Sequence, residues 1–119
     1  MSLATTTDTR FADDVLASAT PVLVDFTAAW CAPCRMVAPV LEQIANDESE
    51  RLRVVSIDVD ANPVTTGNYR IMSMPTLALF VDGEVVAQLV GARPRTAIMR
   101  ELEPHLQPAL RAERRPPGQ

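Results

Sequence analysis

The chain has 119 residues, of which 47% are hydrophobic, and carries a formal net charge of −4. This length corresponds to one domain with a core of its own, and the negative charge argues against nucleic acid or an anionic membrane as a partner. No apolar run approaches membrane-spanning length, the first ten residues do not resemble a secretory signal, and two cysteines are too few for a disulfide scaffold. We therefore expect a protein of the cytoplasm, where reductants keep thiols reduced and a close cysteine pair is most often catalytic. We also expect it to be a monomer.

The N-terminal segment is predicted to be weakly structured and to lead into a helix. Residues 2–7 are mostly polar or β-branched, so residues 1–8 are expected to be a flexible terminus or a weak edge strand. Asp8 or Thr9 is suited to cap a helix over residues 10–19, because both side chains accept hydrogen bonds from free backbone N–H groups. The apolar face of that helix is expected to comprise Phe11, Val15 and Leu16.

A buried strand and a second helix follow, and they meet at the two cysteines. Residues 21–27 are nearly all apolar, the pattern of a central strand that is covered on both faces. The helix is expected from Pro33 to about Asp47, because apolar residues recur there at helical spacing and proline suits a first turn. Pro39 lies inside this helix and is expected to kink it, since it removes one backbone hydrogen bond.

The rest of the chain is predicted to complete one mixed sheet. We expect its strands and helices, in order, over residues 52–58, 63–69, 75–81, 84–90 and from 94 onward. The turn at residues 60–63 is suited to cap the short helix, Asp82-Gly83 is a two-residue hairpin signal, and Pro104 is expected to end or bend the last helix. The fold class is α/β, a single mixed central sheet flanked by helices on both faces.

The predicted domain covers residues 9–107. Residues 108–119 are rich in proline and arginine and are predicted to be a disordered tail.

Cys31 and Cys34 form a C-x-x-C motif at the junction between the buried strand and its helix. Such a pair is either a redox motif or half of a zinc site, and zinc requires four ligands. The only histidine is His105 in the last helix, so the sequence favours redox chemistry and no metal, with a zinc half-site bridging a dimer as the minor alternative. Cys31 is expected to attack disulfides, because a helix N-terminus favours the thiolate, and the less exposed Cys34 is expected to resolve the mixed disulfide.

Asp25 interrupts the buried strand six residues before Cys31. It is either a satisfied structural acid or a desolvated acid with a raised pKa that takes the proton from Cys34. Pro75 opens a strand that should lie beside the catalytic one. Proline is tolerated at the first residue of a strand, and the residues alone leave the isomer of its peptide bond open.

The resemblance to the thioredoxin family covers roughly residues 11–106 and rests on four motifs: Val-Leu-Val-Asp-Phe…Ala-Trp-Cys-x-Pro-Cys-Arg-Met-Val-Ala-Pro, Ile-Asp-Val-Asp-x-Asn-Pro, Met-Pro-Thr-Leu-x-Leu-Phe-x-Asp-Gly-Glu and Val-Gly-Ala. It implies a thioredoxin fold with Cys31 as nucleophile, Cys34 as resolving thiol and Asp25 as buried acid. It also implies a cis peptide bond before Pro75, which would face the cysteines.

The resemblance further implies a protein-disulfide reductase that holds no cofactor. Its electrons would come from NADPH through a thioredoxin reductase, and its other partners would be disulfide-containing proteins. An extended segment of the substrate would pair with the main chain of Met74. The implied substrate-binding residues are Trp30, Ala32, Pro33, Met74, Gly91 and Ala92.

Three residues depart from the pattern of the family. Ala32 stands where the family usually has glycine and is expected to tune the reduction potential. Thr27 replaces a common tryptophan, which removes an aromatic packing partner beside the active-site loop. Ser56 stands where a lysine often lies near the buried acid, and the chain has no lysine, so Asp25 is predicted to titrate higher than in relatives with that lysine. These departures motivate the alternative of a specialised relative that serves one dedicated partner or acts as a binding or holdase module.

Overall fold

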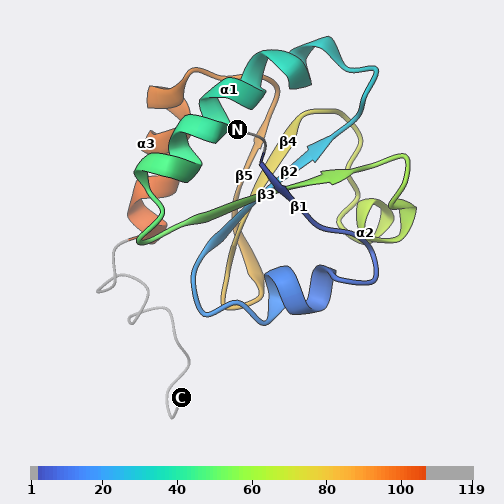
Figure 1. Cartoon of the computed structure of the whole chain (residues 1–119), viewed down its shortest axis with the longest axis horizontal. Coiled ribbons are helices and arrows are strands. Elements are labelled where there is room, and N and C mark those ends of the chain that lie inside the picture. The colour runs from blue at the N-terminus through green and yellow to red at the C-terminus, as the bar shows by residue number, and fades with distance from the viewer. Residues whose placement is uncertain (1–2, 107–119) are drawn as a thin grey trace.

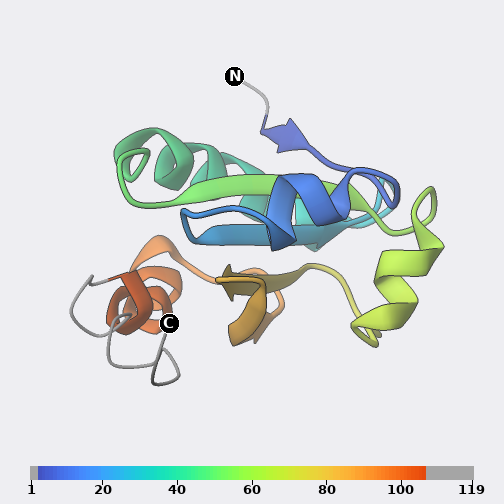
Figure 2. The ribbon, with the colours of Figure 1, turned by 90° about the horizontal axis from the view of Figure 1, so that it is seen from below.

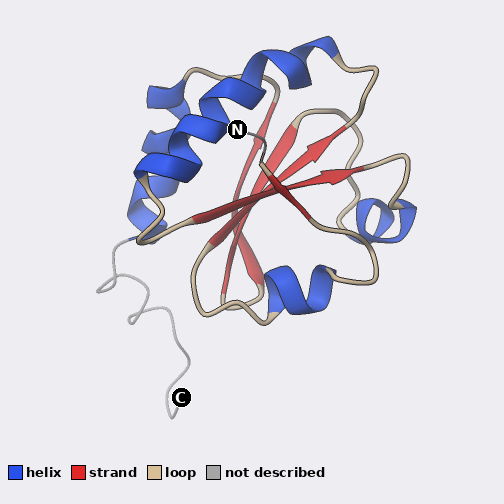
Figure 3. Cartoon of the chain, viewed as in Figure 1, coloured by secondary structure: helices blue, strands red, loops and turns tan. Residues whose placement is uncertain are grey.

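The computed structural model describes residues 3–106, which form a five-stranded sheet with helices on both faces (Figures 1 and 3). The predicted fold class is confirmed. The strands are β1 (Ala4–Thr5), β2 (Val22–Thr27), β3 (Arg53–Asp58), β4 (Thr76–Val81) and β5 (Glu84–Val90). The helices are η1 (Ala12–Leu16), α1 (Ala32–Asp47), α2 (Pro63–Asn68) and α3 (Arg95–Leu106).

The sheet has the order β1-β3-β2-β4-β5, and Figure 2 shows the strands stacked in this order from β1 at the top. β1 and β2 both run parallel to β3, whereas β4 is antiparallel to β2 and to β5. The central position of β2 explains why its residues from Val22 to Phe26 are all buried, as their apolar run predicted. Asp82 and Gly83 both have positive φ, of 52° and 83°, which confirms the predicted two-residue hairpin.

Two hydrophobic clusters lie on opposite faces of the sheet, because successive residues of β2 point to opposite sides. Leu23 belongs to the cluster that contains the apolar residues of α1 and α3. Val24 and Phe26 belong to the other, with Phe11, Val15 and the segment after α2. Asp25 lies two residues after Leu23 and points to the same face, so the carboxyl of Asp25 lies on the α1 side of the sheet.

The segment predicted as a helix over residues 10–19 forms only the short π-helix η1, with turns on either side. Phe11 and Val15 are buried as expected, but Leu16 is 37% exposed, so its assignment to the apolar face was wrong. The predicted cap was also wrong, because no side chain caps η1.

Asp8 instead caps α2, which lies more than fifty residues further along the chain. Its two carboxylate oxygens accept the backbone N–H groups of Val64 at 3.1 Å and Thr65 at 2.8 Å. Those N–H groups have no partner within their own helix, so a carboxylate satisfies them and favours the positive helix end. Asn62, in the turn predicted to cap α2, makes no side-chain cap. Its amide oxygen accepts the N–H of Asp8, which fixes the N-terminal segment against α2.

The two long helices continue through their internal prolines. α1 extends past Pro39 to Asp47, and the kink predicted at Pro39 stays a prediction. α3 includes Pro104, which therefore does not end it before Leu106. Within residues 3–106, no helix is both long and apolar enough to cross a membrane. The predicted tail over residues 108–119 lies outside the described residues.

Candidate active site

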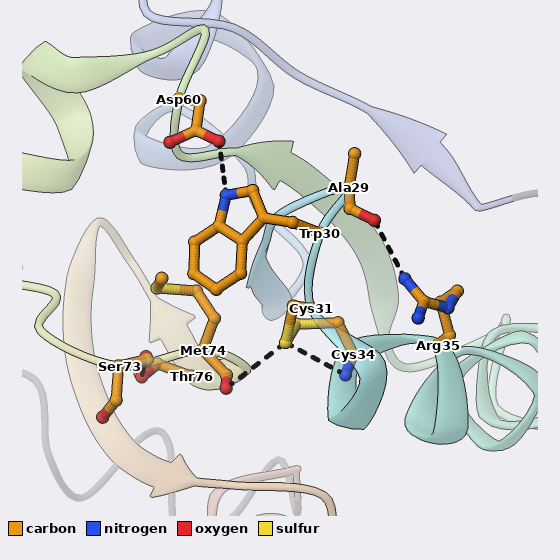
Figure 4. Close-up of a disulfide and its surroundings, with 9 residues drawn as sticks. All are labelled: Ala29, Trp30, Cys31, Cys34, Arg35, Asp60, Ser73, Met74 and Thr76. Carbon is orange, nitrogen blue, oxygen red and sulfur yellow. Dashed lines mark hydrogen bonds between the residues drawn. A yellow bond between two sulfur atoms is a disulfide. The ribbon is translucent and has the colours of Figure 1, made fainter.

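The two cysteines lie at the start of α1 and are joined by a disulfide bond (Figure 4). Cys31 is the N-cap residue, with extended backbone at φ −96° and ψ 109°, and Cys34 lies in the first turn. The backbone N–H of Cys34 donates to Sγ of Cys31 at 3.2 Å. In the dithiol form, this N–H group and the helix dipole both favour a thiolate at Cys31, which is the property an attacking thiol needs.

The disulfide is buried, and its two cysteines differ in their surroundings rather than in their exposure. Cys31 is 4% and Cys34 is 3% exposed, so the predicted difference in exposure is absent in the disulfide form. Sγ of Cys31 lies 3.5 Å from the carbonyl oxygen of Met74. Cys34 instead borders a pocket that it shares with Asp25. The two cysteines therefore have different neighbours: Cys31 lies beside the carbonyl of Met74, and Cys34 lies beside the pocket that contains Asp25.

Trp30 precedes the disulfide and is 64% exposed, an unusual state for the largest apolar side chain of the protein. Its indole Nε1 donates to Oδ2 of Asp60 at 2.8 Å (Figure 4). Asp60 is fixed in turn because its backbone N–H donates to Oδ1 of Asp58 at 2.9 Å. Asp60 was not predicted from the sequence, although an indole N–H requires an acceptor and the Asp-Val-Asp-Ala-Asn turn offers several carboxylates.

Arg35 is a second residue of the site that was not predicted from the sequence. Its Nη1 donates to the carbonyl oxygen of Ala29 at 2.9 Å (Figure 4). The N–H of Cys31 donates to the carbonyl oxygen of Ala28 at 3.2 Å. These two bonds connect the loop before the disulfide to itself and to the first turn of α1, so they hold the cysteines in place.

A distant segment completes the site around the bond between Met74 and Pro75. This peptide bond is cis, as the family resemblance implied. The N–H of Gly91 donates to the carbonyl oxygen of Pro75 at 2.8 Å, which brings the end of β5 beside the start of β4. Gly91 has φ +92°, where residues with a Cβ are strained, so the chain requires glycine here.

The other predicted binding residues lie at the surface. Ala32 and Pro33 are exposed in the first turn of α1, and Ala92 is exposed next to Gly91. The structure thus brings Trp30, the disulfide, Met74, Pro75 and Gly91 into one region, while Ala92 lies at its margin.

Asp25 is 3% exposed, and its Oδ1 has no hydrogen-bond partner among the described residues. Burial raises the pKa of Asp25 to about 7, in the direction predicted from the sequence. The register places it opposite Ser56 of β3 and Leu77 of β4, and neither side chain carries a charge. With a pKa near neutrality, this carboxyl is suited to accept a proton.

A zinc half-site that bridges a dimer is one of the alternatives that the sequence leaves open. Over the described part of the chain, no group of three or more His, Cys, Asp and Glu side chains is arranged to hold a metal ion.

Comparison with known proteins gives concordant matches. A family model of thioredoxin matches residues 2–104. A thioredoxin of Mycobacterium tuberculosis is 55% identical over 96 residues, which cover 81% of this chain and 83% of that protein. Thioredoxin 1 of Synechococcus elongatus is 48% identical over 103 residues, 87% of this chain and 96% of its own. A bifunctional thioredoxin reductase/thioredoxin of Mycobacterium leprae is 49% identical over 96 residues, 81% of this chain and 21% of that longer protein.

Proposed function

The chain belongs to the thioredoxin family, and we propose that it reduces disulfides in cytoplasmic client proteins and is itself reduced by a thioredoxin reductase. Its family and its cysteine pair make it a thiol–disulfide oxidoreductase. The observation that carries the proposal is the position of Cys31, whose Sγ accepts a helix N-terminal N–H and faces the carbonyl of Met74. The bifunctional relative, which by its name joins a reductase to a thioredoxin, supports the choice of electron donor.

The proposed reaction transfers two electrons in two exchange steps. The Cys31 thiolate attacks one sulfur of the client disulfide, a mixed disulfide forms, and the other client sulfur leaves as a thiolate. Cys34 then loses its proton to Asp25 and attacks Sγ of Cys31. The second client sulfur leaves, and the Cys31–Cys34 disulfide of the present structure results. The reductase would restore the dithiol with two electrons from NADPH.

The proposed docking surface surrounds Cys31. Trp30, Ala32 and Pro33 expose their side chains beside the disulfide, and Met74 presents its main chain at the start of β4. An extended client segment would pair with the backbone of Met74 and so place its disulfide next to Cys31, as in other interactions that add a strand to a sheet edge. Gly91 and Ala92 would form the far side of this surface.

We place this reaction in the cytoplasm and assign it to a monomer. A disulfide reductase needs a constant supply of reductant, which a reducing compartment provides. The net charge of −4 supports a protein that associates with neither nucleic acid nor an anionic membrane.

The proposal is tested by insulin reduction driven by NADPH and thioredoxin reductase. Turnover is expected for the parent protein and none for Cys31→Ser. Cys34→Ser is expected to accumulate a mixed disulfide with insulin, because the resolving thiol is absent. A parent protein that reduces insulin with dithiothreitol but not with the reductase would instead favour the specialised relative with a dedicated partner. Turnover that survives Cys31→Ser would refute the assignment of the nucleophile.

A further inference from the structure

A pocket of about 510 Å³ lies beside Cys34 and is lined by residues of β1, β2, β3 and α1. Its charged lining residues are the three acids Asp25, Glu42 and Asp58, and one base, Arg35. The guanidinium of Arg35 donates to the carbonyl of Ala29, and burial is the sole cause of the shift in the pKa of Asp25. Among residues 3–106, no cationic group donates a hydrogen bond to Oδ1 of Asp25, and acids outnumber bases in the lining, so the pocket favours a positively charged occupant.

Asp25 is the residue of this pocket whose state is unusual. It is 97% buried, Oδ1 accepts no hydrogen bond from any described residue, and Ser56 and Leu77 face it across the sheet. A buried carboxylate without a donor is costly, and a cationic donor is the partner that lowers this cost most. The small side chains of Thr27 and Ser56 border the same pocket, so they leave space in which such a donor fits.

The apolar lining of the pocket indicates which chemical group a bound cation would carry. Ala28, Ala29 and Ala38 contribute apolar surface from the active-site loop and from α1. A pocket with apolar walls and one buried acid is complementary to a short alkyl chain that ends in a hydrogen-bond-donating cation. The volume lies within the range of small-molecule sites, well above the roughly 30 Å³ that one water molecule occupies.

We propose that this pocket binds a primary alkylammonium ion, whose ammonium group donates to the carboxylate of Asp25 while its alkyl chain packs against the three alanines. The proposal concerns a ligand site and holds whether or not the protein reduces disulfides. Its consequence for exchange is that the bound amine would lower the proton affinity of Asp25.

The site should be linked to the protonation of Asp25. The amine binds the ionised carboxylate, so its affinity should rise as the pH increases through the pKa of Asp25 and should level off above it. The other ionisable groups that border the pocket are Glu42 and Arg35 on α1 and Asp58 on β3, while Cys34 is held in the disulfide. An amine held only by Glu42 and Asp58 would not follow the titration of Asp25.

The test is a carbon-13 NMR titration of the Asp25 carboxyl group in the oxidised full-length protein. n-Butylammonium chloride is compared with tetramethylammonium chloride at equal ionic strength, because the latter has the same charge but no N–H donor. Saturating n-butylammonium is expected to lower the pKa of Asp25 by about one unit or more, which is tenfold in proton affinity. Equal shifts with the two salts, or no saturable shift with either, would mean that only water and diffuse ions occupy the pocket and would overturn the proposal.

Three variants make the test specific. Ala38→Leu fills the pocket and should abolish the n-butylammonium effect. The matched control Ala45→Leu lies on the same helix beside a separate pocket of about 270 Å³ and should retain it. Ser56→Lys places an ammonium group opposite Asp25 and should lower the pKa of Asp25 without added amine. If Ala38→Leu folds and keeps the effect, or if Ser56→Lys leaves the pKa of Asp25 unchanged, the assigned position of the amine is wrong.

Discussion

Replacing Asp25 with asparagine should change how the stability of the oxidised protein depends on pH. Burial raises the pKa of this carboxyl from its usual 3.8 to about 7 in the folded state. Between these two values the folded protein keeps a proton that the unfolded chain has lost. The free energy of unfolding therefore falls as the pH rises through this window, and it becomes constant above about pH 7.

The size of the effect follows from the same two pKa values. The difference is about three units, and each unit corresponds to about 1.4 kcal/mol, so the ionised Asp25 costs about 4 kcal/mol at alkaline pH. That cost is a large part of the roughly 5–15 kcal/mol that stabilises a typical domain. Asparagine has nearly the same shape and no charge. The free energy of unfolding of the variant, relative to that of the parent, should therefore rise by about this amount when the pH is raised from about 4 to about 8.5.

Urea denaturation of both oxidised proteins at several pH values measures the difference. The hydrogen-bonding cost of the asparagine amide is the same at every pH, so the change in the difference isolates the ionisation of Asp25. Glu101→Gln, which removes an exposed carboxyl from α3, is the control for the loss of one negative charge. A stability difference that stays constant within about 0.5 kcal/mol from about pH 4 to pH 8.5 would refute the buried, raised-pKa state of Asp25.

Three further predictions test single features of the fold and of the docking surface. Gly91→Ala should cost about 1–2 kcal/mol of the free energy of unfolding, because Gly91 has φ +92°, although nothing lies within 4 Å of the added Cβ. An unchanged urea midpoint would contradict this. Leu41→Ala should cost about 2–5 kcal/mol because Leu41 is fully buried, whereas Leu16→Ala, at a residue 37% exposed, should cost under about 1 kcal/mol. Equal losses in the free energy of unfolding for the two variants would show that Leu16 packs in the hydrophobic core. Trp30→Phe should lower kcat/KM for insulin reduction by about two- to tenfold, since it removes a hydrogen bond to Asp60 that orients the indole. Asp60→Asn keeps an acceptor oxygen, so a larger loss in that variant would show that the bond is not the cause.

The sequence predicted best where one pattern determined one element. The apolar run of β2 and the helical spacing of α1 gave both elements nearly at their observed bounds, because burial on both faces and burial on one face leave different periodicities. The Asp82-Gly83 pair gave the hairpin, since both residues must adopt positive φ. The C-x-x-C spacing predicted a cysteine pair that can form a disulfide, and the structure shows this bond at the start of α1.

The failures concern contacts between residues that are far apart in the chain. Asp8 has the local signature of a helix cap, yet it caps α2, because the fold places the unpaired N–H groups of Val64 and Thr65 within its reach. The bond from Trp30 to Asp60 spans 30 residues, and no local pattern specifies which carboxylate the indole meets. Side-chain hydrogen bonds of this kind depend on the completed sheet, so periodicity and propensity carry no information about them.

The two cysteines of the disulfide have different neighbours, and this difference bears on how the reaction is controlled. Asp25 points toward α1, where it shares the pocket with Cys34, whereas Sγ of Cys31 lies beside the carbonyl of Met74. In the proposed reaction the client therefore arrives at Cys31 from the exposed surface, and the proton leaves Cys34 on the pocket side. A ligand bound in the pocket would change the proton acceptor without covering Met74 or Trp30. Such a ligand should shift the pH dependence of kcat and leave KM for the client unchanged, whereas a competitor at the docking surface would raise KM at every pH.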